Sequence, residues 1–156
     1  MLAHCVLSRE MCNVSVVVGV YAELDDDVRQ SDNIIVSRWR VVSADQQGEV
    51  RDKVDEILRP LGSETGLLVI SRDNGIAVCF ICRTLSAVMS LRYQWRSREL
   101  RVIVEDLFTF LSGVTDTVEV KRLAWPLTDY ERHLDFFSCV QGKHLNCSYV
   151  TSTHYH

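Results

Sequence analysis

The chain has 156 residues, a length typical of a single globular domain. It is 47% hydrophobic and 24% charged, a composition that argues against disordered and fibrous proteins. Its net charge of −4 argues against general nucleic-acid binding, because a surface that follows the phosphate backbone needs an excess of basic residues.

The N-terminal residues and the cysteines bear on cellular location. Residues 1–12 lack a basic segment followed by an apolar one, which argues against a signal peptide. No later run approaches the roughly 18 uncharged apolar residues that span a bilayer. We therefore predict a cytoplasmic protein without membrane contact, whose six cysteines are reduced thiols. We also predict one domain over residues 1–140 and a loose tail over residues 141–156.

The first half of the chain predicts strands and one helix. Residues 14–22 form a valine-rich apolar run typical of a buried central strand. Residues 34–42 alternate loosely and suit either an added strand or the lead-in to a helix, and we take the strand. Ser43 and Gln46 have the spacing of a capping box, which predicts that a helix begins there. The apolar stripe of this helix, expected to face the sheet, is Val50, Val54, Ile57, Leu58 and Leu61.

A β-hairpin is the clearest local pattern in the chain. Residues 67–71 and 76–83 are rich in apolar side chains of high β propensity. Asp73, Asn74 and Gly75 separate these runs, and an Asn-Gly pair accepts the positive φ angles of a type I′ turn. The sequence therefore predicts two antiparallel strands joined by a tight turn.

A helix in two pieces follows the hairpin. The pattern after Thr84 is helical as far as Trp95, and Ser97 is a candidate cap for the second piece. The predicted core face of the second piece is Leu100, Ile103, Val104, Leu107 and Leu111. The opposite face is Arg98, Arg101, Glu105, Thr109 and Ser112.

The last elements complete a known plan. Val118 and Val120 alternate with charged residues, which predicts a half-buried strand. Thr128 and Glu131 have capping-box spacing and open a short helix that carries Leu134, Phe137 and Val140. The order βαββαβ plus a terminal helix is a split βαβ plan. It predicts an α+β fold with an antiparallel four-stranded sheet and helices on one face.

The sequence shows no pattern typical of a catalytic or metal site. Cys79 and Cys82 lie three apart in a predicted strand and so point to opposite faces, and no second CxxC pair completes a four-ligand site. Cys139 and His133 fall on different faces of a predicted helix. No glycine-rich phosphate loop is present. We expect no enzymatic activity, no cofactor and no metal.

The densest basic cluster is a candidate binding patch. Arg92, Arg96, Arg98 and Arg101 are interleaved with Tyr93 and Trp95. One interpretation is a solvated helix junction with local ion pairs, such as Arg101 with Glu105. The other is a recognition patch, because arginine and tryptophan are favoured anchors in protein interfaces.

Three segments resemble the N-terminal domains of the TRADD type, named after the tumour necrosis factor receptor-associated death domain adaptor. These segments are residues 71–75 (SRDNG), 91–101 (LRYQWRSRELR) and 106–111 (DLFTFL), with fainter similarity at residues 45–47 and 132–139. The similarity spans roughly residues 14–140 as scattered matches within a shared order of elements.

The resemblance implies a ferredoxin-like sandwich that acts as a cytosolic, non-enzymatic adaptor in receptor and cell-death signalling. It implies a protein partner, a trimeric signalling protein of the TRAF type, which docks on the sheet edge and the hairpin. Ser71, Arg72 and Asp73 occupy the matching hairpin positions, and Tyr21 lies in the matching first strand. The first strand here is more aliphatic than the aromatic pattern of that family.

Other classes of function fit the same fold. A small-molecule-sensing domain would keep a sealed apolar pocket between the sheet and the helices. An RNA-recognition motif would need stacking aromatics on its central strands, where this sequence offers only Phe80. An acylphosphatase-like hydrolase would need an early glycine-rich loop with an arginine, which the sequence lacks.

Overall fold

The computed structural model describes residues 15–25, 32–44, 48–72, 75–113 and 116–139. The predicted tail over residues 141–156 lies outside this part of the chain. The helices and strands in chain order are β1 (Val16–Leu24), α2 (Asp32–Ala44), α3 (Glu49–Leu58), the 3₁₀ turn η3 (Arg59–Leu61), β2 (Thr65–Arg72), β3 (Gly75–Cys82), α4 (Leu85–Arg96), α5 (Glu99–Ser112), β4 (Val120–Ala124) and α6 (Leu127–Ser138).

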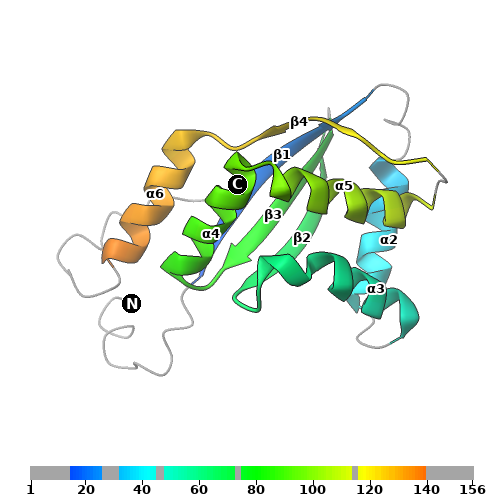
Figure 1. The fold of residues 1–156 in the computed structure, drawn as a ribbon, viewed down its shortest axis with the longest axis horizontal. Helices are drawn as coiled ribbons and strands as arrows, with labels where there is room; N and C mark the ends of the chain where they lie inside the picture. The colour runs from blue at the N-terminus through cyan, green and yellow to red at the C-terminus, as the bar shows by residue number, and fades with distance from the viewer. Residues whose placement is uncertain (1–14, 26–31, 45–47, 73–74, 114–115, 140–156) are drawn as a thin grey trace.

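The strands of the described residues form one antiparallel sheet in the order β2-β3-β1-β4. Two crossovers join strands that are not neighbours, and each contains two helices, α2 with α3 and α4 with α5. Helices α2 to α5 pack on one face of the sheet, and α6 lies beside α4 and β1 (Figure 1). This is the ferredoxin-like α+β arrangement, so the predicted split βαβ plan is confirmed.

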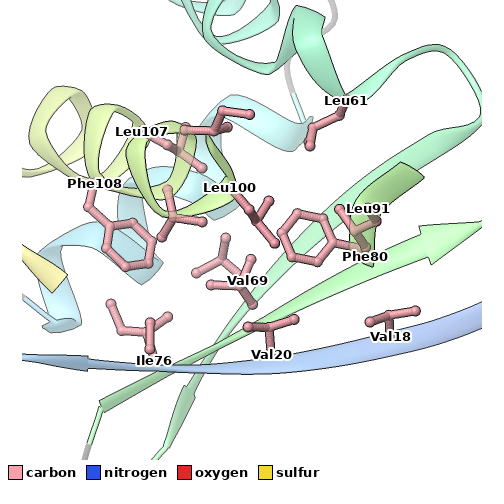
Figure 2. Packing of buried hydrophobic residues seen from close by; sticks show 14 of the residues in the cluster. Val18, Val20, Leu61, Val69, Ile76, Phe80, Leu91, Leu100, Leu107 and Phe108 are labelled. Carbon is pink, nitrogen blue, oxygen red and sulfur yellow. The ribbon is translucent and has the colours of Figure 1, made fainter. Parts of the chain in front are cut away.

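The core lies between the sheet and the helices. Alternate residues of β1, among them Val18 and Val20, point toward the helices together with Ile76 and Phe80 of β3 (Figure 2). The predicted core stripe of α5 meets them, and all five of its members are buried. A small-molecule-sensing domain would keep its sealed pocket in this same layer.

The predicted strand over residues 34–42 is wrong, because this segment is helix α2. Its buried residues are Ile35, Val36, Trp39 and Val42, spaced as one face of a helix. Exposed Val41 beside buried Val42 breaks that period in the sequence, so the apolar pattern looked like loose alternation.

The capping boxes were also misleading. Ser43 lies inside α2 and its hydroxyl donates to the Arg40 carbonyl, while α3 begins later, after Gly48, without a side-chain cap. Helix α6 likewise begins after Pro126 rather than at Thr128. Residues 45–47 and Val140 lie outside the described residues.

Two further helix expectations need correction. Val50, placed on the buried stripe of α3, has 51% of its surface exposed. The hydroxyl of Ser97 donates to the Gln94 carbonyl at the end of α4, and Arg98 takes the N-cap position of α5. Thr84, by contrast, caps α4, because its hydroxyl accepts the Ala87 N–H at 3.0 Å.

The cysteines within the described residues divide into two groups. Cys79 and Cys82 are free and buried, and burial raises the pKa of the Cys82 thiol to about 11, so this thiol stays protonated at neutral pH. Cys139 is disulfide-bonded. The expectation that every cysteine is a reduced thiol is therefore wrong at Cys139.

Candidate functional site

The sheet face that points away from the helices is apolar at one end and charged at the other. In β1 this face carries Val17, Gly19, Tyr21 and Glu23, which alternate with the core residues. Glu23 forms ion pairs with Lys121 and Arg122 of β4. Val17 has 36% of its surface exposed, and Gly19 is exposed. In β3 the same face carries small or apolar residues, of which Cys79 pairs with Gly19 and Ile81 with Val17. We call these β1 and β3 residues the outer sheet face.

Tyr21 lies at the hairpin end of the outer sheet face. It pairs with Ala77, and its ring reaches Gly75, the first residue of β3. A Cβ atom at Gly75 would lie 3.0 Å from Tyr21 Oη and would clash with the Ala22 carbonyl oxygen, so only glycine fits there. Gly75 is the register partner of Arg72. The fold thus brings Tyr21 to the strand ends that hold the predicted hairpin residues.

The predicted hairpin residues terminate an edge strand. β2 is the first strand of the sheet and pairs with β3 alone among the described strands. Ser71 and Arg72 end β2, opposite Ile76 and Gly75, while Asp73 lies outside the described residues. An edge strand offers backbone donors and acceptors to a partner chain.

Phe80 does not belong to the outer sheet face. Its ring is 1% exposed and points toward the helices (Figure 2). It therefore cannot stack a base on the outer sheet face, as an RNA-recognition motif would require.

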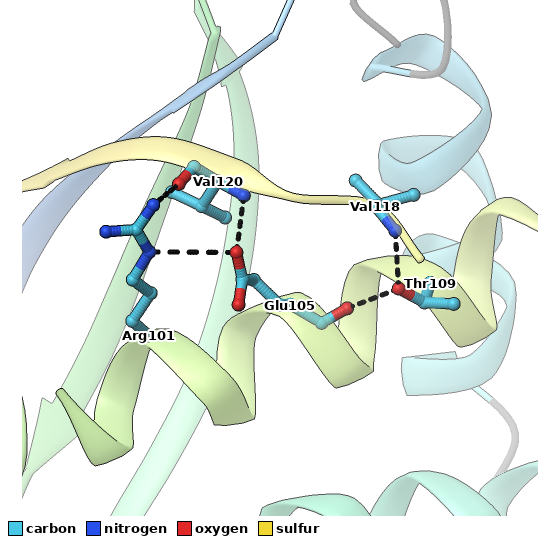
Figure 3. A network of polar contacts seen from close by, with 5 residues as sticks. All are labelled: Arg101, Glu105, Thr109, Val118 and Val120. Atoms are coloured by element: carbon cyan, nitrogen blue, oxygen red, sulfur yellow. Dashed lines mark hydrogen bonds and ion pairs between the residues drawn. The ribbon is translucent and has the colours of Figure 1, made fainter. Parts of the chain in front are cut away.

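The basic cluster does not form one open patch, because Arg101 is part of the fold. Its guanidinium donates to the Val120 carbonyl and lies 3.6 Å from the Glu105 carboxylate (Figure 3). Glu105 accepts the Val120 N–H at 2.7 Å, and Thr109 accepts the Val118 N–H at 2.8 Å. The face of α5 opposite the core therefore holds the segment that enters β4 and is not simply solvated.

Arg92 is also held by the fold. Its guanidinium carbon lies 4.3 Å from the ring centre of Trp95, 5.0 Å from Trp125 and 4.9 Å from Tyr130. Its Nη1 donates to the Trp125 carbonyl at 3.0 Å, and Trp95 Nε1 donates to the Leu123 carbonyl at 3.0 Å. These contacts tie α4 to the connection between β4 and α6.

The remaining members of the cluster, Arg96 and Arg98, are exposed. Arg98 has a φ of 73°, in the left-handed region that disfavours side chains with a Cβ. The structure thus separates the four arginines into two that support the fold and two that are open to solvent. Arg92 and Trp95 lie one helical turn apart, and this spacing was the sequence signal for the role of Arg92 in the fold.

The described residues contain no group of three or more histidine, cysteine or acidic side chains placed to hold a metal ion. They also contain no helix that is both long and apolar enough to cross a membrane. Comparisons with protein-family models, with curated proteins and with solved structures find no match.

Proposed function

We propose that this domain is a non-enzymatic adaptor module that docks a trimeric signalling protein of the TRAF type. The resemblance of residues 71–75, 91–101 and 106–111 to TRADD-type domains motivates the class of partner. One structural observation carries the proposal: Tyr21 and the end of the predicted hairpin site meet at Gly75, at the rim of an apolar sheet face.

The docking surface we propose combines two recognition modes. The edge strand β2 offers backbone hydrogen bonds, which supply affinity without demanding particular side chains. The outer sheet face offers exposed Val17 and half-buried Tyr21 and Ile81, which supply apolar contact area. Arg72 is the expected anchor, because arginine is enriched among residues that dominate binding energy.

A role in receptor and cell-death signalling and a cytoplasmic location belong to the same proposal. Both rest on the resemblance and on the N-terminal composition. The disulfide at Cys139 weighs against a cytoplasmic location, because disulfides are rare in reducing compartments.

The experiment is surface plasmon resonance with a purified TRAF-type trimer as the analyte. Arg72→Glu should remove most of the binding. The double variant Arg96→Glu with Arg98→Glu should keep it, because these side chains are exposed on the helical layer. Circular dichroism checks that both variants fold.

The reverse outcome decides against this surface. If Arg72→Glu keeps full binding while the double variant loses it, the hairpin is not the docking site. If the unmodified domain does not bind a TRAF-type trimer, the proposed class of partner is wrong.

A further inference from the structure

A second candidate site lies in the helical layer, on elements other than the outer sheet face. A surface cavity of about 510 Å³ opens between α4 and α6. Its α4 wall comes from residues spaced as one helical face, and its lining is Met89, Arg92, Tyr93, Arg96, Ser97 and Tyr130.

Two arginines give this cavity its charge. Arg92 and Arg96 stand one helical turn apart, a spacing at which like charges destabilise a helix. The described lining contains no carboxylate, and neither arginine forms an ion pair within the described residues. Burial lowers the pKa of Arg92, Tyr130 opposes this shift, and the charge of Arg96 adds a smaller lowering. An anion between the two guanidinium groups would relieve the repulsion.

Arg92 is positioned for such an anion before any ligand arrives. Three aromatic rings and the Trp125 carbonyl hold its guanidinium group in place. A guanidinium has five N–H donors, and this hydrogen bond uses one of them. A ligand that binds the others need not order the side chain, so the entropic cost of binding is low.

The other walls of the cavity are apolar and aromatic. Tyr93 has 67% of its surface exposed and Met89 51%, while Tyr130 is half-buried. Exposed large side chains beside two arginines are suited to a ligand that has both an aromatic ring and an anionic group. A free phosphate ion would leave these walls unused.

We propose that this cavity binds phosphotyrosine within a peptide segment of a partner protein. The phosphate lies between Arg92 and Arg96, and the phenyl ring packs against Tyr93 and Met89. The site is separate from the hairpin end, so either one can fail without the other.

The test is fluorescence anisotropy with a labelled short peptide that has phosphotyrosine at its centre and alanine around it. We expect saturable binding, and at least about tenfold weaker binding of the same peptide without phosphate. Arg96→Gln removes one of the two guanidinium groups and should lower the affinity about tenfold or more. Arg96 is exposed, so we expect this variant to fold. Arg122→Gln removes one positive charge from an exposed position on β4 and should leave the affinity unchanged.

The control peptides and variants make the proposal falsifiable. Equal binding of a phosphoserine peptide would overturn the role of the aromatic wall. Equal losses in Arg96→Gln and Arg122→Gln would show a general charge effect and overturn the site. Arg96-dependent binding to phosphoinositide vesicles, without peptide binding, would replace the peptide by a membrane surface and overturn the proposal. Failure of the phosphotyrosine peptide to bind would overturn it directly.

Discussion

Each arginine of the basic cluster has the role that its surroundings give it. Arg92 contacts three aromatic rings and the Trp125 carbonyl, and Arg101 contacts the Glu105 carboxylate and the Val120 carbonyl. Arg96 and Arg98 are exposed to solvent. Side chains of one type at similar spacing thus divide between supporting the fold and remaining open to a ligand.

Arg98 offers a test of backbone strain at a single residue. A residue with a Cβ costs about 1–2 kcal/mol in the left-handed region, whereas glycine adopts it freely at an entropic cost of about 0.5–1 kcal/mol. Arg98→Gly should therefore raise the free energy of unfolding by roughly 0.5 kcal/mol in urea denaturation. Arg98→Ala removes the same charge but keeps the Cβ, so it should show no gain. An equal gain in both variants would assign the effect to charge.

His133 makes stability depend on pH. The side chain is 1% exposed, and burial lowers its pKa below the ordinary value of 6.5, while Asp129 and the Val17 backbone oppose the shift. The unfolded chain therefore takes up a proton at a higher pH than the folded chain. This contribution to stability is full above about pH 6.5 and falls as the pH drops below it.

The measurement is urea unfolding of the parent protein and of His133→Gln at about pH 7.5 and about pH 5.5. The parent should lose about 1 kcal/mol more than the variant on acidification. Identical losses would show that His133 is not the titrating group.

At the scale of elements, helix α5 makes contacts on two opposite faces. One buries the stripe that includes Leu100 and Leu107 against the sheet. The other uses Arg101, Glu105 and Thr109 to bind the backbone of residues 118–120 (Figure 3). This helix therefore supports the core and positions the edge strand β4.

The first test of α5 concerns its polar face. Thr109→Val removes the acceptor of the Val118 N–H and should cost about 1–3 kcal/mol, because a buried donor loses its partner. Thr117→Val makes the same chemical change at an exposed position and should stay within about 0.5 kcal/mol of the parent. Urea denaturation measures both. Equal effects would show that the hydrogen bond at Val118 contributes nothing specific.

The second test concerns the core face of α5. Leu107 is 1% exposed, so Leu107→Ala should cost about 2–5 kcal/mol. Val102, 53% exposed on the same helix, is the control, and Val102→Ala should change stability by less than about 0.5 kcal/mol. A loss below that limit at Leu107 would show that the core is not packed around this helix.

The elements predicted correctly are those whose pattern involves residues close together in the sequence. The antiparallel pairing of β2 with β3 and the phase of α5 are both confirmed, while the turn residues 73–74 lie outside the described residues. Helix α2 was missed because exposed Val41 hides its period. The capping boxes failed because residues such as Ser43 bond within the preceding helix instead. The contact of Tyr21 with Gly75 needed the register of β1 against β3, which no local pattern contains.

At the scale of the whole molecule, the two faces of the sheet differ in kind. One is sealed by helices α2 to α5 and contains the core (Figure 1). The other carries small and apolar residues together with Glu23, and Tyr21 joins it to the hairpin end. Its β3 residues Ala77 and Cys79 are buried, while Val17 and Gly19 of β1 are exposed. Our account therefore places partner docking on the outer sheet face and the edge strand β2.

Hydrogen–deuterium exchange of the domain, alone and with a purified TRAF-type trimer, tests this claim most directly. The account predicts that the trimer slows exchange in β2 and in the part of β1 around Tyr21. Exchange in α4, which faces the helical layer, should stay unchanged. Protection confined to α4 and α6, with β2 unaffected, would contradict the account and place docking on the helical layer.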